Sequence, residues 1–249
     1  SLASGYYLTE FDKADRYLAP GKTMGEFSRL LVHTTAHRLF EDSNVRASRF
    51  RSRIEYTLRS LDKLGATETP TFVMAHVVAP HPPFVLGREL DAIPEGEPIH
   101  FNDGTDRIRT EEQREQYVDL YRNQLRVLNK LVEEAVSSLV TRPEADRPVI
   151  VLASDHGPGS ELRNHSLEET DLRERFGSLF AVYLPNGGSN DPLPDPMTPV
   201  NAFRLIFNRY MEADYPLLPS RSFFSAWDRP FDLIEIDDRQ LELRTTQDG

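Results

Sequence analysis

The chain has 249 residues, of which 39% are hydrophobic and 28% charged, with no cysteine and a formal net charge of −11. This is the composition of an ordinary globular protein, and the length suffices for one large domain with a proper core. The lack of cysteine excludes disulfides and thiolate metal sites, and the acidic charge disfavours nucleic acid or an anionic membrane surface as a partner.

Two helices are predicted in the first quarter of the chain. Thr23 and Glu26 form a capping-box pattern in front of apolar residues at helical spacing, and residues 46–64 carry a second apolar stripe. His33 and His37 lie four residues apart on the first helix, a spacing that suits a metal. No nearby acid completes a site, so we favour a solvated or packed face for these two histidines.

Residues 71–78 (T-F-V-M-A-H-V-V) predict a strand buried on both faces. The strand runs into P-H-P-P-F at residues 80–84, where three prolines make a stiff turn around His81. An imidazole fixed at the carboxyl end of a strand suits pre-organised contact with an anion or a metal-bound substrate. His81 is therefore a candidate catalytic residue, and an ordinary loop histidine is the alternative. His76, inside the strand, is a weaker candidate, with a satisfied core histidine as its alternative.

A long polar excursion follows at residues 87–109, and residues 111–140 form the longest predicted helix. The helix has one broad apolar stripe, which favours packing against a sheet. It connects the strand at residues 71–78 to a second apolar run at residues 149–153. The sequence therefore predicts a βαβ unit with parallel strands.

The apolar run at residues 149–153 (V-I-V-L-A) ends in the motif S-D-H-G. In open α/β sheets, ligands bind just beyond the carboxyl ends of strands, which is where Asp155 and His156 fall. A carboxylate oxygen and an imidazole nitrogen together suit Zn²⁺ or Mn²⁺. We therefore predict that this pair holds a metal, and the alternative is a simple turn built by Asp155 and Gly157.

The chain beyond this motif contains another histidine, His165, in a polar stretch. Further elements are predicted as a strand at residues 177–185, a Pro- and Gly-rich loop at 186–199, a helix from 198 to 210, and an edge strand within 231–243. There are no internal repeats and no Walker-type phosphate loop, so residues 1–249 are predicted to form a single domain.

Three segments in this order resemble the alkaline phosphatase and sulfatase superfamily: P-H-P-P-F at residues 80–84, S-D-H-G-P-G at 154–159, and T-P-V-N-A-F-R at 198–204. The likeness is strongest to its membrane-anchored phosphoethanolamine transferases and lipoteichoic-acid synthases, and it covers residues 5–227. It implies a three-layer αβα fold with a mostly parallel central sheet, incomplete at the N-terminus of this chain.

The same resemblance implies a function. Asp155 and His156 would hold part of a divalent metal site for Mn²⁺ or Zn²⁺, with Ca²⁺ as a third option. His81 and His165 would contact the phosphate or sulfate group of an ester substrate. The expected activity is a metal-dependent hydrolase or transferase of phosphate or sulfate esters, in which a Thr, Ser or formylglycine nucleophile attacks phosphorus or sulfur.

The chain departs from this family pattern in its N-terminal part. The nucleophile and the remaining acidic ligands of such domains precede anything that matches here, so we expect them upstream of Ser1. Because Zn²⁺ or Mn²⁺ normally needs three protein ligands, we expect this chain alone to bind metal weakly and to turn over little substrate.

Two other functions stay open at this point. One is a non-catalytic relative that serves as a binding or scaffold domain, and the other is an acidic interaction module unrelated to the superfamily. The resemblance further implies an extracytoplasmic domain, joined to a membrane only through an anchor outside this chain. No apolar run approaches the roughly 20 residues of a membrane span, and no signal peptide opens the sequence.

Overall fold

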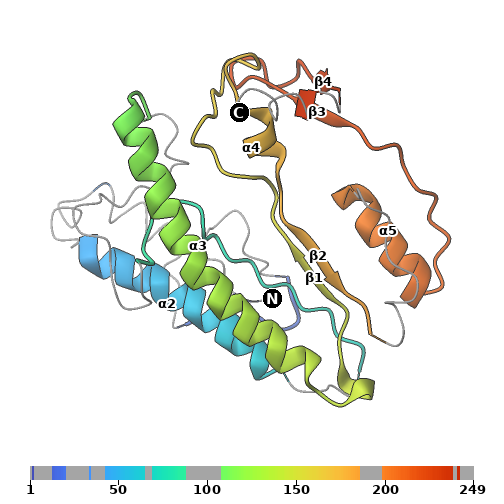
Figure 1. Ribbon diagram of the computed structural model, residues 1–249. Coiled ribbons are helices and arrows are strands. Elements are labelled where there is room, and N and C mark those ends of the chain that lie inside the picture. The colour runs from blue at the N-terminus through green and yellow to red at the C-terminus, as the bar shows by residue number, and fades with distance from the viewer. Residues whose placement is uncertain are drawn as a thin grey trace, which may run out of the picture. The chain divides into compact units, whose positions relative to one another are not determined.

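The computed structural model describes residues 2, 13–20, 34, 43–64, 69–87, 108–185, 198–237 and 240–241 (Figure 1). The chain divides into two compact units, an N-terminal unit, Ser1–Arg147, and a C-terminal unit, Pro148–Gly249. A single domain over the whole chain stays a prediction. Within the described ranges, no helix combines the length and the apolar character that a membrane crossing requires.

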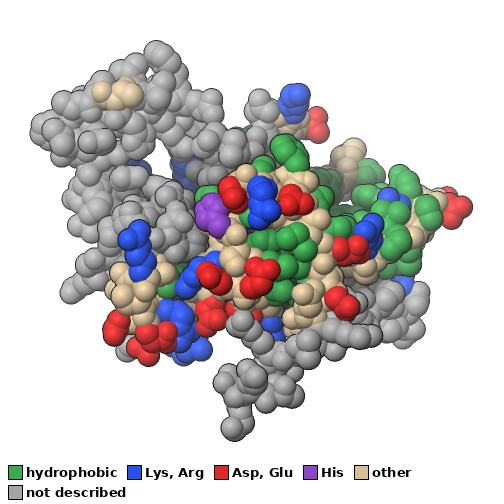
Figure 2. Space-filling model, turned by 90° about the horizontal axis from the view of Figure 1, so that it is seen from above, with side chains coloured by type: hydrophobic (Ala, Val, Ile, Leu, Met, Phe, Trp, Pro, Cys, Tyr) green, Lys and Arg blue, Asp and Glu red, His purple; other side chains and the backbone are tan. Residues whose placement is uncertain are grey.

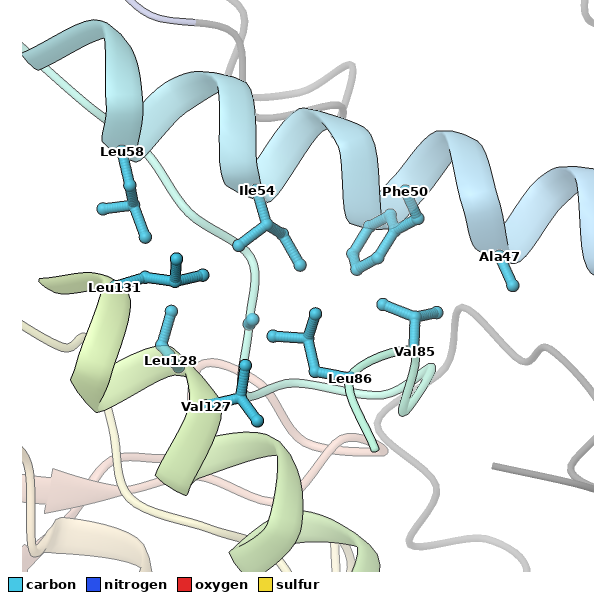
Figure 3. Close-up of a cluster of buried hydrophobic side chains, with 10 residues drawn as sticks. Ala47, Phe50, Ile54, Leu58, Val85, Leu86, Val127, Leu128 and Leu131 are labelled. Carbon is cyan, nitrogen blue, oxygen red and sulfur yellow. The ribbon is translucent and has the colours of Figure 1, made fainter. Parts of the chain in front are cut away.

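In its described part, the N-terminal unit contains the helices α2 (Ser43–Asp62) and α3 (Glu111–Val140) and an extended segment at residues 69–87. Helix α2 directs one apolar side chain per turn toward α3 and the extended segment (Figure 3). The buried core consists of Ala47, Phe50, Ile54, Leu58, Ala79, Val85, Leu86, Val127, Leu128 and Leu131. The apolar stripe predicted for residues 46–64 is thus confirmed as the inner face of α2.

Helix α3 begins and ends where the sequence predicts. Thr110 caps its first turn, because the Thr110 hydroxyl accepts from the Gln113 amide at 3.3 Å and the Gln113 side chain accepts from the Thr110 amide at 3.2 Å. Glu111 and Glu112 place negative charge at the positive end of the helix dipole. A short 3₁₀ turn, η4 (Glu144–Asp146), follows the helix.

The prediction of a buried strand at residues 71–78 is wrong. This segment runs extended, but its one recorded bridge is an isolated pairing of Ala75 with Leu2. Phe72 is 79% exposed instead of buried. An apolar and β-branched run favours extended backbone, but a strand also needs a neighbour that pairs its N–H and C=O groups along its length. Among the described residues, no second strand lies beside this segment.

The C-terminal unit begins with a hairpin-like sheet of β1 (Ile150–Ala153) and β2 (Phe180–Tyr183). Both strands were predicted, but they pair antiparallel, with Ile150 opposite Tyr183 and Ala153 opposite Phe180. A short helix, α4 (Leu172–Phe176), lies on the connection between them. Because residues 71–78 form no strand, the predicted parallel βαβ unit is not found among the described residues.

The unit continues with α5 (Pro199–Tyr210), β3 (Ser222–Phe224) and β4 (Ile234–Ile236). The helix predicted from 198 to 210 is confirmed, with proline at its first position. Strand β4 confirms the predicted strand within 231–243 and pairs antiparallel with β3. The two sheets of the described residues have two strands each, so the mostly parallel central sheet of the predicted αβα fold is not found there.

The surface of the C-terminal unit is rich in apolar side chains, including Trp227, Phe231 and Leu233. In Figure 2, hydrophobic side chains reach the surface among acidic and basic ones. Several predicted features lie outside the described residues: the first helix with Thr23, Glu26, His33 and His37, most of the excursion at 87–109, and most of the loop at 186–199.

Candidate functional site

The S-D-H-G motif directly follows the end of β1. Ser154 extends the ladder of the sheet by one residue, because its backbone N–H donates to the carbonyl of Leu179 at 2.9 Å. The Ser154 hydroxyl also accepts from the Leu179 amide at 2.7 Å. The serine of the motif therefore has a structural role, and it fixes the backbone from which Asp155 and His156 project.

The imidazole of His156 is held by the backbone of the next residue. Its Nδ1 lies 2.8 Å from the carbonyl oxygen of Gly157, and a carbonyl oxygen only accepts, so Nδ1 carries the proton. The other ring nitrogen, Nε2, faces Asp155, whose Oδ2 lies 3.5 Å away. The other oxygen, Oδ1, accepts from the His156 amide at 3.1 Å. Both side chains are thus oriented by hydrogen bonds to the adjacent backbone, as metal ligands commonly are.

Helix α4 holds this motif in place through hydrogen bonds. The Gly157 amide donates to the Arg175 carbonyl at 2.8 Å, and Arg175 Nη1 donates back to the Gly157 carbonyl at 3.2 Å. The Glu174 carboxylate accepts from the Ser160 amide at 3.2 Å and hydroxyl at 2.5 Å, and from the Glu161 amide at 3.0 Å. Through these contacts α4 fixes the chain on the far side of His156.

The geometry of the pair fits two corners of a tetrahedral metal site. Ligand atoms at about 2.1 Å from a tetrahedral ion lie about 3.4 Å apart, close to the 3.5 Å between His156 Nε2 and Asp155 Oδ2. The Asp155 side chain is 87% exposed, so the site is open to solvent. In the part of the chain that the structure describes, no group of three or more His, Cys, Asp or Glu side chains could hold a metal. The described residues therefore offer half of a site.

His81 lies in the N-terminal unit, in the turn made by P-H-P-P-F. Its amide donates to the Val78 carbonyl at 3.0 Å, and its Nδ1 lies 2.5 Å from the carbonyl oxygen of Pro82. Nδ1 again carries a proton, so Nε2 of His81 is the ring nitrogen left for a contact with another group. His81 and His156 therefore share one arrangement, in which the backbone carbonyl of the next residue fixes the tautomer.

The turn around His81 is anchored on α3. Phe84 packs edge-on against Tyr117, with ring centroids 5.3 Å apart, and the two aromatic rings belong to a second buried cluster that includes Ile108. Gln124, on the same face of α3, is fully buried and hydrogen-bonds to the backbone on both sides of the turn. The stiff turn predicted from the prolines is in fact held by side chains of α3.

His165 is 68% exposed, and its Nδ1 lies 3.4 Å from Asp228 Oδ1. This hydrogen bond lowers the pKa of the Asp228 carboxyl below its ordinary value. Since the described residues contain no metal-ligand group of three, His165 does not join Asp155 and His156 in one cluster. Its contact with an ester group stays a prediction. His76, half-buried in the extended segment, has interactions of its own.

Sequence reasoning missed Gln124, Glu174 and Arg175. A signal for Gln124 exists, since it is a polar residue in the middle of an apolar helical stripe, and buried polar groups are almost always hydrogen-bonded. No comparable signal marks Glu174 and Arg175, which lie in a short polar helix.

These observations describe a chain of helices and strands with an acid–imidazole pair at a strand end and a second, backbone-fixed histidine. A family model for sulfatases matches residues 5–184, which is more than half of the chain. The chain belongs to the sulfatase family, in the alkaline phosphatase and sulfatase superfamily. No curated protein and no solved structure matches it.

The stretch that matches the sulfatase family contains all four predicted site residues, His81, Asp155, His156 and His165, and it spans parts of both units. Membership of this family has two further consequences. It implies an α/β fold of the alkaline phosphatase type and a domain related to hydrolases of sulfate or phosphate esters. It also overturns the alternative of an acidic interaction module unrelated to the superfamily.

Proposed function

We propose that this chain acts in the metal-dependent cleavage or transfer of phosphate or sulfate esters, with a nucleophile supplied by a segment upstream of Ser1. The proposal is supported by membership of the sulfatase family. The observation that carries it is that two imidazoles have the same hydrogen bond to the backbone. In both His81 and His156, the proton is fixed on Nδ1 by the next backbone carbonyl, and Nε2 is left for chemistry.

Asp155 and His156 are the residues that would hold the ion. One carboxylate oxygen and one imidazole nitrogen favour Mn²⁺ or Zn²⁺, while Ca²⁺ prefers an all-oxygen shell. A bound ion of this kind polarises the ester and stabilises the negative charge that develops on the transferred group. A third ligand would come from residues other than those described, in line with the expected upstream segment.

His81 would contact the ester group. When Nε2 takes up a proton, both ring nitrogens donate, one to the Pro82 carbonyl and the other to an oxygen of the substrate. A charged imidazole that donates to an anionic oxygen makes a strong and directional hydrogen bond. His165 is proposed as a second contact, and protonated His165 would share its charge between Asp228 and the substrate.

The test is turnover of aryl phosphate and aryl sulfate by the full-length protein with Mn²⁺ or Zn²⁺. We expect Asp155→Ala combined with His156→Ala to lower turnover by about 100-fold or more. Asp232→Ala, which changes an exposed acid that pairs with nearby Arg229, serves as the matched control and should leave turnover unchanged. Undiminished activity in the double variant would show that this pair is not the metal site.

A non-catalytic binding or scaffold role is the second candidate. It is favoured by the lack of a third metal-ligating side chain near Asp155 and His156 among the described residues. This role predicts binding of inorganic phosphate or sulfate without turnover of either ester, even in the full-length protein with metal.

An extracytoplasmic location and a membrane anchor outside this chain are also proposed, on the same family likeness. Cell fractionation tests both.

A further inference from the structure

Gln124 uses its whole side-chain amide to hold the turn that carries His81. Its Oε1 accepts from the amides of Val85 at 2.8 Å and Leu86 at 3.1 Å. Its Nε2 donates to the carbonyls of Pro80 at 3.0 Å and His81 at 3.3 Å. Gln124 is 0% exposed, and Val85 and Leu86 are 1% and 0% exposed, so no water can replace the amide at these two backbone groups.

The turn cannot supply these hydrogen bonds itself. Three of its residues are prolines, which have no N–H to donate. Within the described residues 69–87 the turn is not part of a strand, so no sheet neighbour there pairs its carbonyls and amides. One side chain from α3 therefore joins the beginning of the turn, at Pro80 and His81, to its end, at Val85 and Leu86.

The same backbone sets the position of the His81 ring. The carbonyl of His81, which Gln124 binds, belongs to the peptide unit that leads into Pro82. The carbonyl of Pro82 in turn holds Nδ1 of His81 at 2.5 Å. A shift of the His81–Pro82 peptide unit would move that acceptor and release the ring from its single tautomer.

We propose that Gln124 is a positioning residue for His81: it fixes the turn so that the Pro82 carbonyl holds the proton on Nδ1 and Nε2 is presented to the ester group. The use of that nitrogen rests on the proposed function, whereas the effect of Gln124 on the ring does not. The two can therefore be tested separately.

The first experiment observes the ring directly. In long-range ¹H–¹⁵N NMR spectra of the full chain, with the His81 signals assigned by their loss in His81→Ala, we expect one tautomer with the proton on Nδ1. Gln124→Met keeps the shape of the side chain but removes both the donor and the acceptor, and it should shift the His81 nitrogens toward the average of two tautomers. Gln124→Asn, which keeps an amide one methylene shorter, takes its place if the methionine variant does not fold.

Asn123 provides a matched control. It is also buried on α3, but among the described residues its side chain bonds within the helix, to Asp119 at 3.0 Å and to Arg126 at 3.3 Å. Asn123→Ala should leave the His81 nitrogen shifts unchanged. An unchanged His81 spectrum in a folded Gln124 variant overturns the proposal, as would an equal change in Asn123→Ala.

The second experiment asks whether Gln124 acts through His81. In the full-length protein with metal, Gln124→Met should lower turnover of aryl phosphate or sulfate about 10- to 100-fold, chiefly in kcat. In a His81→Ala background, the same change should lower turnover less than about twofold further, since the residue it positions is gone. Equal losses in both backgrounds would mean that Gln124 supports only the fold. If His81→Ala alone has no effect, the proposed role of His81 fails, and the NMR result still decides the role of Gln124.

Discussion

Gly157 lies so close to Glu174 that a Cβ atom added to Gly157 would stand 1.9 Å from the Glu174 carbonyl oxygen. Backbone atoms cannot move aside as the end of a flexible side chain can. The contact explains why the S-D-H-G motif ends in glycine at this position. It also means that α4 and the candidate metal ligands are packed as one piece.

We predict that Gly157→Ala pushes α4 away from the motif. Overpacking of this kind costs about 1–3 kcal/mol, and the loss of the Gly157–Arg175 hydrogen bonds releases the carbonyl that orients His156. Mn²⁺ affinity, measured by electron paramagnetic resonance, should fall about tenfold or more. Glu169→Ala, an exposed change on the same connection, is the control and should leave Mn²⁺ affinity unchanged. Equal Mn²⁺ affinity in Gly157→Ala and the unaltered protein would contradict this account of the glycine.

Gln124 should also matter for stability. Gln124→Ala leaves the buried amides of Val85 and Leu86 without a partner, and each such group costs about 1–3 kcal/mol before the turn relaxes. The carbonyls of Pro80 and His81 also lose their donor, but these residues are only half-buried. We expect a total loss of about 2–4 kcal/mol in the free energy of unfolding measured by urea denaturation. Asn123→Ala removes hydrogen bonds only within α3 and should cost about 1 kcal/mol. A Gln124 variant as stable as the Asn123 variant would show that the turn satisfies its backbone by other means.

The parts of the fold that could be predicted from the sequence depend on local signals. Helix α3 matches its predicted bounds because a capping box and a continuous apolar stripe are both encoded within it. Strand β1 was predicted from its apolar run, but its partner was not. The register of a sheet depends on residues far apart in the chain, and β1 pairs antiparallel with the strand at Phe180–Tyr183.

The candidate site shows the same division. The sequence could predict candidate site residues at Asp155, His156 and His81, because carboxylates and imidazoles are common metal ligands and catalysts. The prolines and the strand end beside them are also visible in the sequence. What orients them could not be proposed. Gln124 lies 43 residues from His81, and only the packing of α3 on the turn brings the two together. Contacts of this length follow from tertiary structure, not from local spacing.

The hairpin of β3 and β4 should depend on pH through one ion pair. Arg221 donates two hydrogen bonds to Glu235, at 2.7 and 2.6 Å, and these lower the pKa of Glu235 below its ordinary value of 4.5. A lowered pKa in the folded state means that the pair stabilises the hairpin above pH 4.5 and that this contribution is lost as the pH falls through the folded pKa. Because both side chains are exposed, added salt should weaken the effect.

The single tryptophan, Trp227, lies on the segment that connects β3 to β4 in the chain. Its fluorescence can therefore be used to follow the opening of the hairpin. Its fluorescence should change as the pH falls below 4.5 in the unaltered protein and change less in Glu235→Gln. The pKa of Asp228 is also lowered, by its hydrogen bond from His165, so Asp228→Asn is needed to separate the two contributions. An identical fluorescence titration in Glu235→Gln and the unaltered protein would exclude the ion pair as the cause.

The asparagine of the P-V-N segment holds the chain that returns along α5. Asn201 Nδ2 donates to the Leu218 carbonyl at 2.8 Å, and its Oδ1 accepts from the Leu218 amide at 2.9 Å. Two turns later, Asn208 makes the same pair of bonds with Tyr215, at 2.9 and 2.8 Å. The segment at residues 215–218 is therefore tied to the helix through its backbone, while its side chains are exposed.

We predict that Asn201→Ala frees this segment. Asn201 is buried, so the loss of both bonds should cost about 1–3 kcal/mol in local stability. Chymotrypsin cleavage after Leu217, the one of Tyr215, Leu217 and Leu218 that does not precede a proline, should then become about 5- to 150-fold faster, because cleavage follows the population of the open state. Asn208→Ala removes the more exposed pair of bonds and should give the smaller increase. Cleavage at the original rate in Asn201→Ala would mean that packing, and not these two bonds, keeps the segment on α5.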